Sequence, residues 1–228
     1  MISPIRITPL KPQIRYRATF VPPNYNLIKQ DVSIGLATKI TEVFNLKSSS
    51  LIFNQNTLSA QYLSFRYIYP NEPMRYFDAS IGVDQAEFLF SSPANAAELK
   101  DGVIKVWESL FEKSKAVTTE NYFEATFHSL AGDAANVKHY FDDFVKVETD
   151  RTDFIKGFSL TVQHPELMCE ARLGIEPSNA LTNGLYFAFA AITKKKVKDV
   201  NSLASLIDNI ISVYRDIQSL AQIEVVEP

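Results

Sequence analysis

The chain has 228 residues, of which 46% are hydrophobic and 21% are charged, as in ordinary soluble globular proteins. Its formal net charge of −3 at pH 7 gives no basic field that could hold a phosphate backbone, so nucleic acid is excluded as an expected partner. A single cysteine, Cys169, excludes an intramolecular disulfide framework and fits a reducing compartment.

No segment of the sequence is typical of a membrane span or a secretion signal. The longest apolar run, residues 184–192 (GLYFAFAAI), is shorter than the roughly 20 residues with which a helix crosses a bilayer. The first residues, MISPIRITPL, lack the apolar stretch and the small-residue cleavage site of a signal peptide. We therefore expect a cytoplasmic protein without a membrane partner.

The first half of the sequence alternates between strand and helix patterns. Residues 14–21 indicate a strand that stops at Pro22-Pro23, because proline cannot donate to a β-ladder. Apolar residues at three- and four-residue steps then predict a helix over 24–45. The remaining predicted elements of this half are a short strand at 51–53 or 58–62, strands at 63–69, 74–83 and 87–91, and a helix at 97–115.

The second half shows the same succession of patterns. It contains predicted strands at 122–130, 158–164, 168–175 and 185–192, and predicted helices at 134–146 and 202–220. The tail, QIEVVEP, is expected to form a short strand or an arm. Strands that follow one another through short turns predict an antiparallel sheet, and amphipathic helices cover one of its faces.

Two pentapeptides point to an internal duplication. YRATF at 16–20 and FEATF at 123–127 align with a shift of 107 positions (125 − 18). The same shift carries the apolar positions of the helix at 97–115 onto those of the helix at 202–220. We expect an α+β fold built from a duplicated strand–helix–three-strand–helix unit, with repeats at 1–116 and 117–228 in one compact pseudo-symmetric domain.

Alternation along the strands separates an apolar face from a polar face. Tyr76 and Tyr186 lie on the polar face together with seven candidate ligand-binding residues: Arg17, Arg66, Asp78, Glu124, His128, Glu170 and Arg172. One interpretation is a solvated face with cross-strand ion pairs, and the other is a concave ligand site. In a ligand site, Arg17 and Arg66 would bind an anionic group, while Glu124 and His128 could act as an acid–base pair.

The sequence predicts no metal site and no cofactor. It contains no HExxH, CxxC, GxSxG or GxGxxG motif and no Walker loop. The charge run KKKVK, residues 194–198, is typical of a solvated turn, and docking of an anionic partner is the alternative interpretation. No catalytic residue is assigned from these patterns.

Large aromatic residues on the last helix of each repeat indicate either core packing against the sheet or an interface, and the β-prone tail could add to a sheet edge in another chain. The expected interface residues are Trp107, Phe111, Tyr214, Ile223 and Val225. We therefore expect a non-enzymatic protein-interaction or assembly module, a homo-oligomer or an accessory subunit of a multi-protein system. The alternatives are a small-molecule sensor that uses the polar sheet face and an enzyme that uses Glu124 and His128.

Overall fold

The computed structural model describes residues 4–53, 63–131, 134–146 and 156–226. The first half contains β1 (Ile5–Phe20), η1 (Tyr25–Ile28), α1 (Gln30–Phe44), η2 (Ser48–Ser50), β2 (Leu51–Phe53), β3 (Leu63–Ile68), β4 (Tyr76–Ile81), β5 (Gln85–Ser91) and α2 (Ala96–Ser114). The second half contains β6 (Thr118–Leu130), α3 (Ala134–Phe144), β7 (Phe158–His164), η3 (Pro165–Leu167), β8 (Cys169–Pro177), β9 (Gly184–Thr193), α4 (Val200–Leu220) and β10 (Ile223–Val225).

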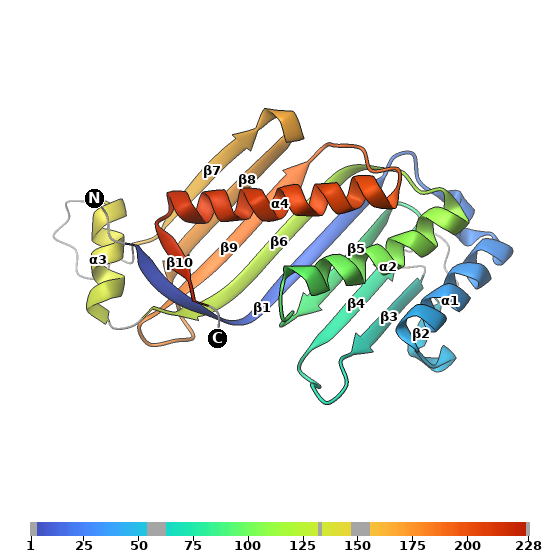
Figure 1. The fold of residues 1–228 in the computed structure, drawn as a ribbon, viewed down its shortest axis with the longest axis horizontal. Helices are drawn as coiled ribbons and strands as arrows, with labels where there is room; N and C mark the ends of the chain where they lie inside the picture. The colour runs from blue at the N-terminus through green and yellow to red at the C-terminus, as the bar shows by residue number, and fades with distance from the viewer. Residues whose placement is uncertain (1–3, 54–62, 132–133, 147–155, 227–228) are drawn as a thin grey trace.

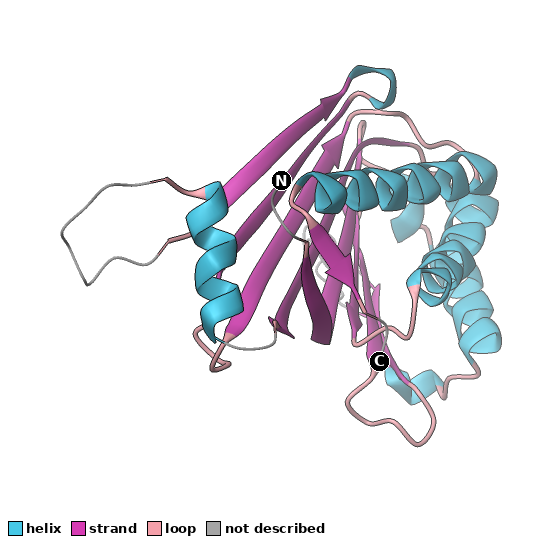
Figure 2. Cartoon of the chain, turned by 60° about the vertical axis from the view of Figure 1, so that its left-hand side comes forward, coloured by secondary structure: helices cyan, strands magenta, loops and turns pink. Residues whose placement is uncertain are grey.

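The strands form one sheet of ten strands, in the order β2-β3-β4-β5-β1-β6-β9-β8-β7, with β10 beside β1 (Figure 1). Neighbours along this order are antiparallel, whereas β10 runs parallel to β1. Figure 2 shows α1, α2 and α4 on the same side of the sheet. The predicted α+β class, with an antiparallel sheet covered by helices on one face, is confirmed.

Both halves of the sheet have the same strand order. β1 is followed outward by β5, β4 and β3, and β6 is followed outward by β9, β8 and β7. The two central strands are paired with Tyr16 opposite Phe123, the residues that the shift of 107 positions makes equivalent. A duplication predicts such an arrangement, and the duplication itself and its repeat boundaries stay predictions.

The core lies between the sheet and the helices. Tyr16 is fully buried at its centre, and its ring stacks on Phe123 at 4.6 Å and on Phe88 at 5.7 Å between centroids. Trp107 of α2 is also fully buried and meets Phe20 of β1 edge-on. Burying such large aromatic side chains is a major source of the stability of the fold.

The helix predicted over 24–45 is interrupted in the structure. Lys29 has an extended backbone with φ −68° and ψ 133°, so it separates η1 from α1. The apolar spacing continues across this residue because Leu27 is buried together with Leu36 and Ile40. The apolar periodicity therefore predicted which positions are buried. It did not predict the break at Lys29, because the break does not change the spacing of the apolar residues.

The tail does not extend away from the molecule as an arm. Ile223 and Val225 of β10 pair with Ile5 and Ile7 of β1, and Arg6 Nε donates to Glu224 Oε2 at 2.9 Å. The backbone of Ile223 and Val225 is thus paired within the same chain, and their use in an interface with another chain stays a prediction. The additional strand length at the start of β1, beyond the predicted 14–21, provides their partner.

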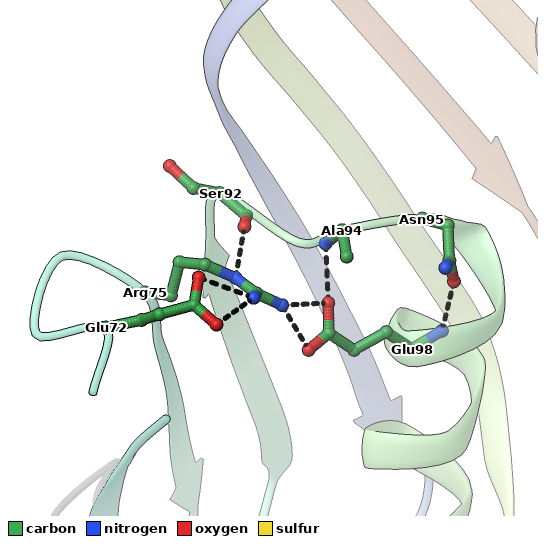
Figure 3. A network of polar contacts seen from close by, with 6 residues as sticks. All are labelled: Glu72, Arg75, Ser92, Ala94, Asn95 and Glu98. Carbon is green, nitrogen blue, oxygen red and sulfur yellow. Dashed lines mark hydrogen bonds and ion pairs between the residues drawn. The ribbon is translucent and has the colours of Figure 1, made fainter. Parts of the chain in front are cut away.

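One polar network fastens the turn between β3 and β4 to the start of α2 (Figure 3). Arg75 donates to both carboxylate oxygens of Glu72 and of Glu98 at 2.6–2.8 Å, and its Nε donates to the Ser92 carbonyl at 3.0 Å. Glu98 also accepts from the Ala94 N–H, while Asn95 caps α2 by accepting from the Glu98 N–H at 2.9 Å. The network orders the loop that leads from the sheet into the helix layer.

Among the described residues, none of the helices combines the length and the apolar character that a membrane crossing needs. Cys169 is buried among the core residues on the helix side of the sheet. Burial raises the pKa of its thiol, which disfavours the reactive thiolate.

Candidate functional site

The candidate site is the face of the sheet that does not contribute to the core, which we call the open face. Its residues alternate along the strands with buried ones such as Tyr16, Phe77, Phe123 and Ala171. The open face includes all seven predicted ligand-binding residues, Arg17, Arg66, Asp78, Glu124, His128, Glu170 and Arg172, together with Arg15, Tyr76, Tyr122 and Tyr186. Alternation thus predicted which side chains share this surface.

A row of charged side chains crosses the open face from β3 to β8. Successive register partners along this row are Arg66, Asp78, Leu89, Arg15, Glu124, Ala190 and Arg172. Arg66 donates from Nε and Nη2 to the two oxygens of Asp78 at 2.6 and 2.7 Å, and these hydrogen bonds raise the pKa of its guanidinium. Arg15 lies between Glu124 at 3.3 Å and Glu87 at 3.4 Å.

Two arginines of the open face have no such partner. Within the described part of the chain, neither Arg17 nor Arg172 forms an ion pair with a carboxylate. Arg17 instead lies over the ring of Tyr122, with its Cζ atom 5.1 Å from the centroid. These two guanidinium groups are therefore available to an anionic ligand.

Three tyrosine rings of the open face each lie beside a cationic or imidazole side chain. The Arg66 Cζ atom is 4.2 Å from the centroid of Tyr76, and Arg17 covers Tyr122. The third ring, Tyr186, has the imidazole of His128 at 5.0 Å between centroids. Cation–π contacts of this kind hold the planar groups in fixed orientations on the sheet surface.

A hollow of about 550 Å³ surrounds the Arg66–Asp78 pair. Its apolar rim includes Ile52, Ile68 and Leu89, and the first two are 65% and 53% exposed. Exposed isoleucines beside an oriented guanidinium leave room for a flat, partly apolar group to lie against the sheet.

His128 contacts Ser178 across the open face. The Ser178 Oγ atom accepts from the N–H groups of Ala180 and Leu181 at 3.1 and 2.9 Å, so its hydroxyl proton is free to donate to His128 Nδ1 at 2.8 Å. No sequence pattern indicated this contact, because 50 residues separate the two side chains.

The structure does not bring Glu124 and His128 together as an acid–base pair. They lie four residues apart on β6, which corresponds to about 13 Å along an extended strand. Glu124 contacts Arg15, and His128 contacts Ser178. Among the described residues, no group of three His, Cys, Asp or Glu side chains is placed to hold a metal ion.

Of the helix residues expected at an interface, Trp107 belongs to the core, and Phe111 and Tyr214 pack against it. Trp107 is 0% exposed, and Phe111 packs on it at 5.0 Å between ring centroids. Tyr214 of α4 packs edge-on against Phe189 of β9 at 4.9 Å. Trp107 is therefore not exposed to a partner, and an interface formed by Phe111 and Tyr214 stays a prediction.

Comparisons with known proteins leave the chain without a family. No protein-family model and no curated protein sequence matches it. Among solved structures, the chain is similar to a rolling circle replication initiator protein from Geobacillus stearothermophilus. The likeness has a TM-score of 0.33 and 10% sequence identity, and it covers 92% of this chain and 85% of the other.

This likeness corrects two expectations from the sequence. Because replication acts on nucleic acid, similarity to an initiator protein contradicts the exclusion of nucleic acid and the expected non-enzymatic assembly module. Neither expectation is carried forward. At this TM-score the likeness assigns no activity and no site residue to the chain.

Proposed function

We propose that the open face binds single-stranded nucleic acid. The observation that carries the proposal is the set of three tyrosine rings, Tyr76, Tyr122 and Tyr186, each beside Arg66, Arg17 or His128 on a solvent-facing sheet. Unpaired bases stack on aromatic rings and on guanidinium planes, and antiparallel sheet surfaces are a common platform for them.

The spacing of the rings fits one extended strand rather than a single base. From the sheet register, Tyr76 lies four strands from Tyr186, about 20 Å away. Tyr122 lies one strand and six residues from Tyr186, again about 20 Å away. The three rings would therefore contact bases that are not adjacent in the bound strand.

The charges on the open face indicate how much of the affinity would come from phosphate contacts and how much from base stacking. Arg17 and Arg172 offer two guanidinium groups to phosphates, whereas Arg15 and Arg66 are already paired with carboxylates. The net charge of the chain is −3, which opposes a polyanion. Stacking would thus provide most of the affinity, and binding would tolerate different sequences because every base has a flat face.

The proposal is tested by fluorescence anisotropy with labelled oligothymidylate and oligouridylate of about twenty nucleotides, longer than the roughly 4–16 nucleotides of known single-strand sites. Replacing Tyr122 or Tyr186 by leucine is expected to weaken binding about tenfold, because one base–aromatic stack contributes about 1–3 kcal/mol. Tyr25→Leu is the matched control, since Tyr25 is 63% exposed on η1, away from the sheet. Equal affinities of all three variants and the wild type, or no binding at low salt, would overturn the proposal.

A further inference from the structure

The loop between β9 and α4 displays four lysines around one buried residue. This segment, residues 194–198, we call the lysine loop; it contains Lys194, Lys195, Lys196 and Lys198. Val197 is fully buried, whereas Lys194, Lys196 and Lys198 are exposed. In Figure 1 the segment leaves the arrowhead of β9 and runs along one end of the sheet toward α4.

The backbone of the lysine loop is fixed to the core at several points. Val197 and Thr118 exchange two backbone hydrogen bonds at 3.0 and 3.2 Å, and the Lys194 N–H donates to the Met168 carbonyl at 3.2 Å. The fully buried Asn121 donates from its amide to the Lys195 carbonyl at 3.0 Å.

Asn121 is itself held by the centre of the sheet. Its Oδ1 atom accepts from the hydroxyls of Tyr16 at 2.8 Å and Thr118 at 3.0 Å. At the other end of the loop, the Lys198 N–H donates to Ser202 Oγ, which belongs to the capping box of α4. A solvated turn does not need these hydrogen bonds. They fix the backbone from which the lysine side chains of the loop extend.

The charges of the lysine loop are not neutralised within the described residues. None of its four ammonium groups forms an ion pair with a carboxylate there. The acidic residues near it by position are Glu120, opposite Lys194 beyond the end of the β6–β9 ladder, Glu170, the register partner of Ile192, and Asp199. The Asp199 carboxylate accepts from the Ser202 N–H at 2.7 Å, which lowers its pKa and commits it to the helix cap.

The lysine loop continues the open face. Ile192 and Tyr122 are register partners that face outward, and Thr193 and Asn121, the next pair, face inward. By alternation, Lys194 returns to the outward side about 7 Å beyond Ile192. A strand stacked on Tyr122 would therefore reach the lysines by continuing past the end of β9.

We propose that the lysine loop binds the phosphates of the single strand whose bases stack on the open face, and so fixes where that strand leaves the sheet. The inference rests on the proposed function. Lysine contacts to phosphates release counterions, so they contribute a salt-dependent part of the affinity, whereas stacking on Tyr122 does not.

The experiment compares binding of oligothymidylate and oligouridylate at several salt concentrations. The double variant Lys194→Gln/Lys196→Gln is expected to reduce the slope of log affinity against log salt by about 1.4, because each lost contact to a single strand contributes about 0.7. The double variant Lys138→Gln/Lys146→Gln removes the same charge from exposed positions in and just after α3. It is expected to leave the slope close to that of the wild type.

The possible outcomes separate this inference from the proposed function. A slope that is unchanged in Lys194→Gln/Lys196→Gln, or lowered equally in the α3 control, overturns the role of the lysine loop. If the loop variant lowers the slope while Tyr122→Leu and Tyr186→Leu bind normally, the lysine loop stands and the stacking face is wrong. Equal slopes for both oligonucleotides indicate that the phosphates, common to DNA and RNA, are the group recognised.

Discussion

Arg75 is the residue whose contacts best illustrate how single side chains organise this chain. Its side chain is 20% exposed and that of Glu98 is 18% exposed, so their ion pair is shielded from water. The Arg75 guanidinium also lies over the Tyr69 ring at 4.7 Å. A planar donor with several N–H groups can serve Glu72, Glu98 and the Ser92 carbonyl together, which the single ammonium group of lysine cannot do.

Replacing Arg75 by alanine is expected to lower the free energy of unfolding by about 2 kcal/mol, because Glu98 loses a charged hydrogen-bond partner in a shielded place. Arg75→Lys should recover only part of this loss. Urea unfolding followed by circular dichroism measures both values. Arg215→Ala, an exposed position on α4, serves as the control and should change stability little. A wild-type midpoint for Arg75→Ala would show that the network is dispensable.

Sequence reasoning reached the open-face residues but not their contacts. Alternation of buried and exposed positions placed Arg17, Arg66 and His128 on one surface, since that pattern depends only on local geometry. It did not indicate that Ser178 forms a hydrogen bond with His128 or that Arg17 lies over the ring of Tyr122. Such pairs depend on the register between strands, which a single strand does not encode.

At the scale of elements, two helix glycines differ in what surrounds them. A Cβ atom on Gly35 of α1 would lie 3.4 Å from Lys113 Cδ, the flexible part of a side chain. A Cβ atom on Gly102 of α2 would lie 2.9 Å from Phe90 Cε1. Phe90 is 1% exposed and stacks on Phe77 at 4.5 Å, so it has no space into which to move. Gly102 therefore permits α2 to approach β5 closely.

Gly35→Ala is expected to stabilise the protein by up to about 1 kcal/mol, the difference in helix propensity between the two residues. Gly102→Ala should instead destabilise it by about 1–3 kcal/mol, because overpacking exceeds that gain. Thermal unfolding of the two variants beside the wild type measures the opposite signs. Equal stabilisation of both variants would contradict the close approach of α2 to β5.

Element boundaries were predictable where apolar periodicity and turn residues agree. The strand at 158–164 was predicted with the bounds of β7, and the helix at 97–115 differs from α2 by one residue at each end. β1 was predicted too short, and the part that was missed contains Pro9 and Pro12, residues that cannot donate to a β-ladder. The structure accommodates them at an irregularity between Leu10 and Gln13, where Lys11 has a positive φ of 46°.

At the scale of the whole molecule, buried tyrosine hydroxyl groups in both halves make the stability of the fold depend on pH. Burial raises the pKa of Tyr16, Tyr69, Tyr140 and Tyr214 above the ordinary value. The unfolded chain ionises its tyrosines near pH 10, where these four are still neutral in the folded state. Their contribution to stability is therefore complete below about pH 10 and is lost as the pH rises above it.

Stability should thus fall as the pH rises above about 10, and Tyr140→Phe should reduce that fall by removing one of the buried phenols. At neutral pH this variant is expected to be less stable than the wild type, because the Tyr140 hydroxyl donates to the Ala221 carbonyl at 2.8 Å. Urea unfolding at several pH values measures both effects. Tyr25→Phe, at an exposed site, should show the pH dependence of the wild type, and an equal change in the two variants would contradict the role of burial.

The position of β1 has a consequence for the order in which the protein is made. β1 precedes every strand with which it pairs, and its contacts reach partners 109 residues later at Glu124 and 218 residues later at Glu224. The ribosome therefore synthesises the central strand β1 before its neighbours in the sheet, β5 and β6. Contacts over such separations form slowly, and an unpaired strand is exposed to other chains in the meantime. The sheet of this protein is completed around its central strand only after β10 has been synthesised.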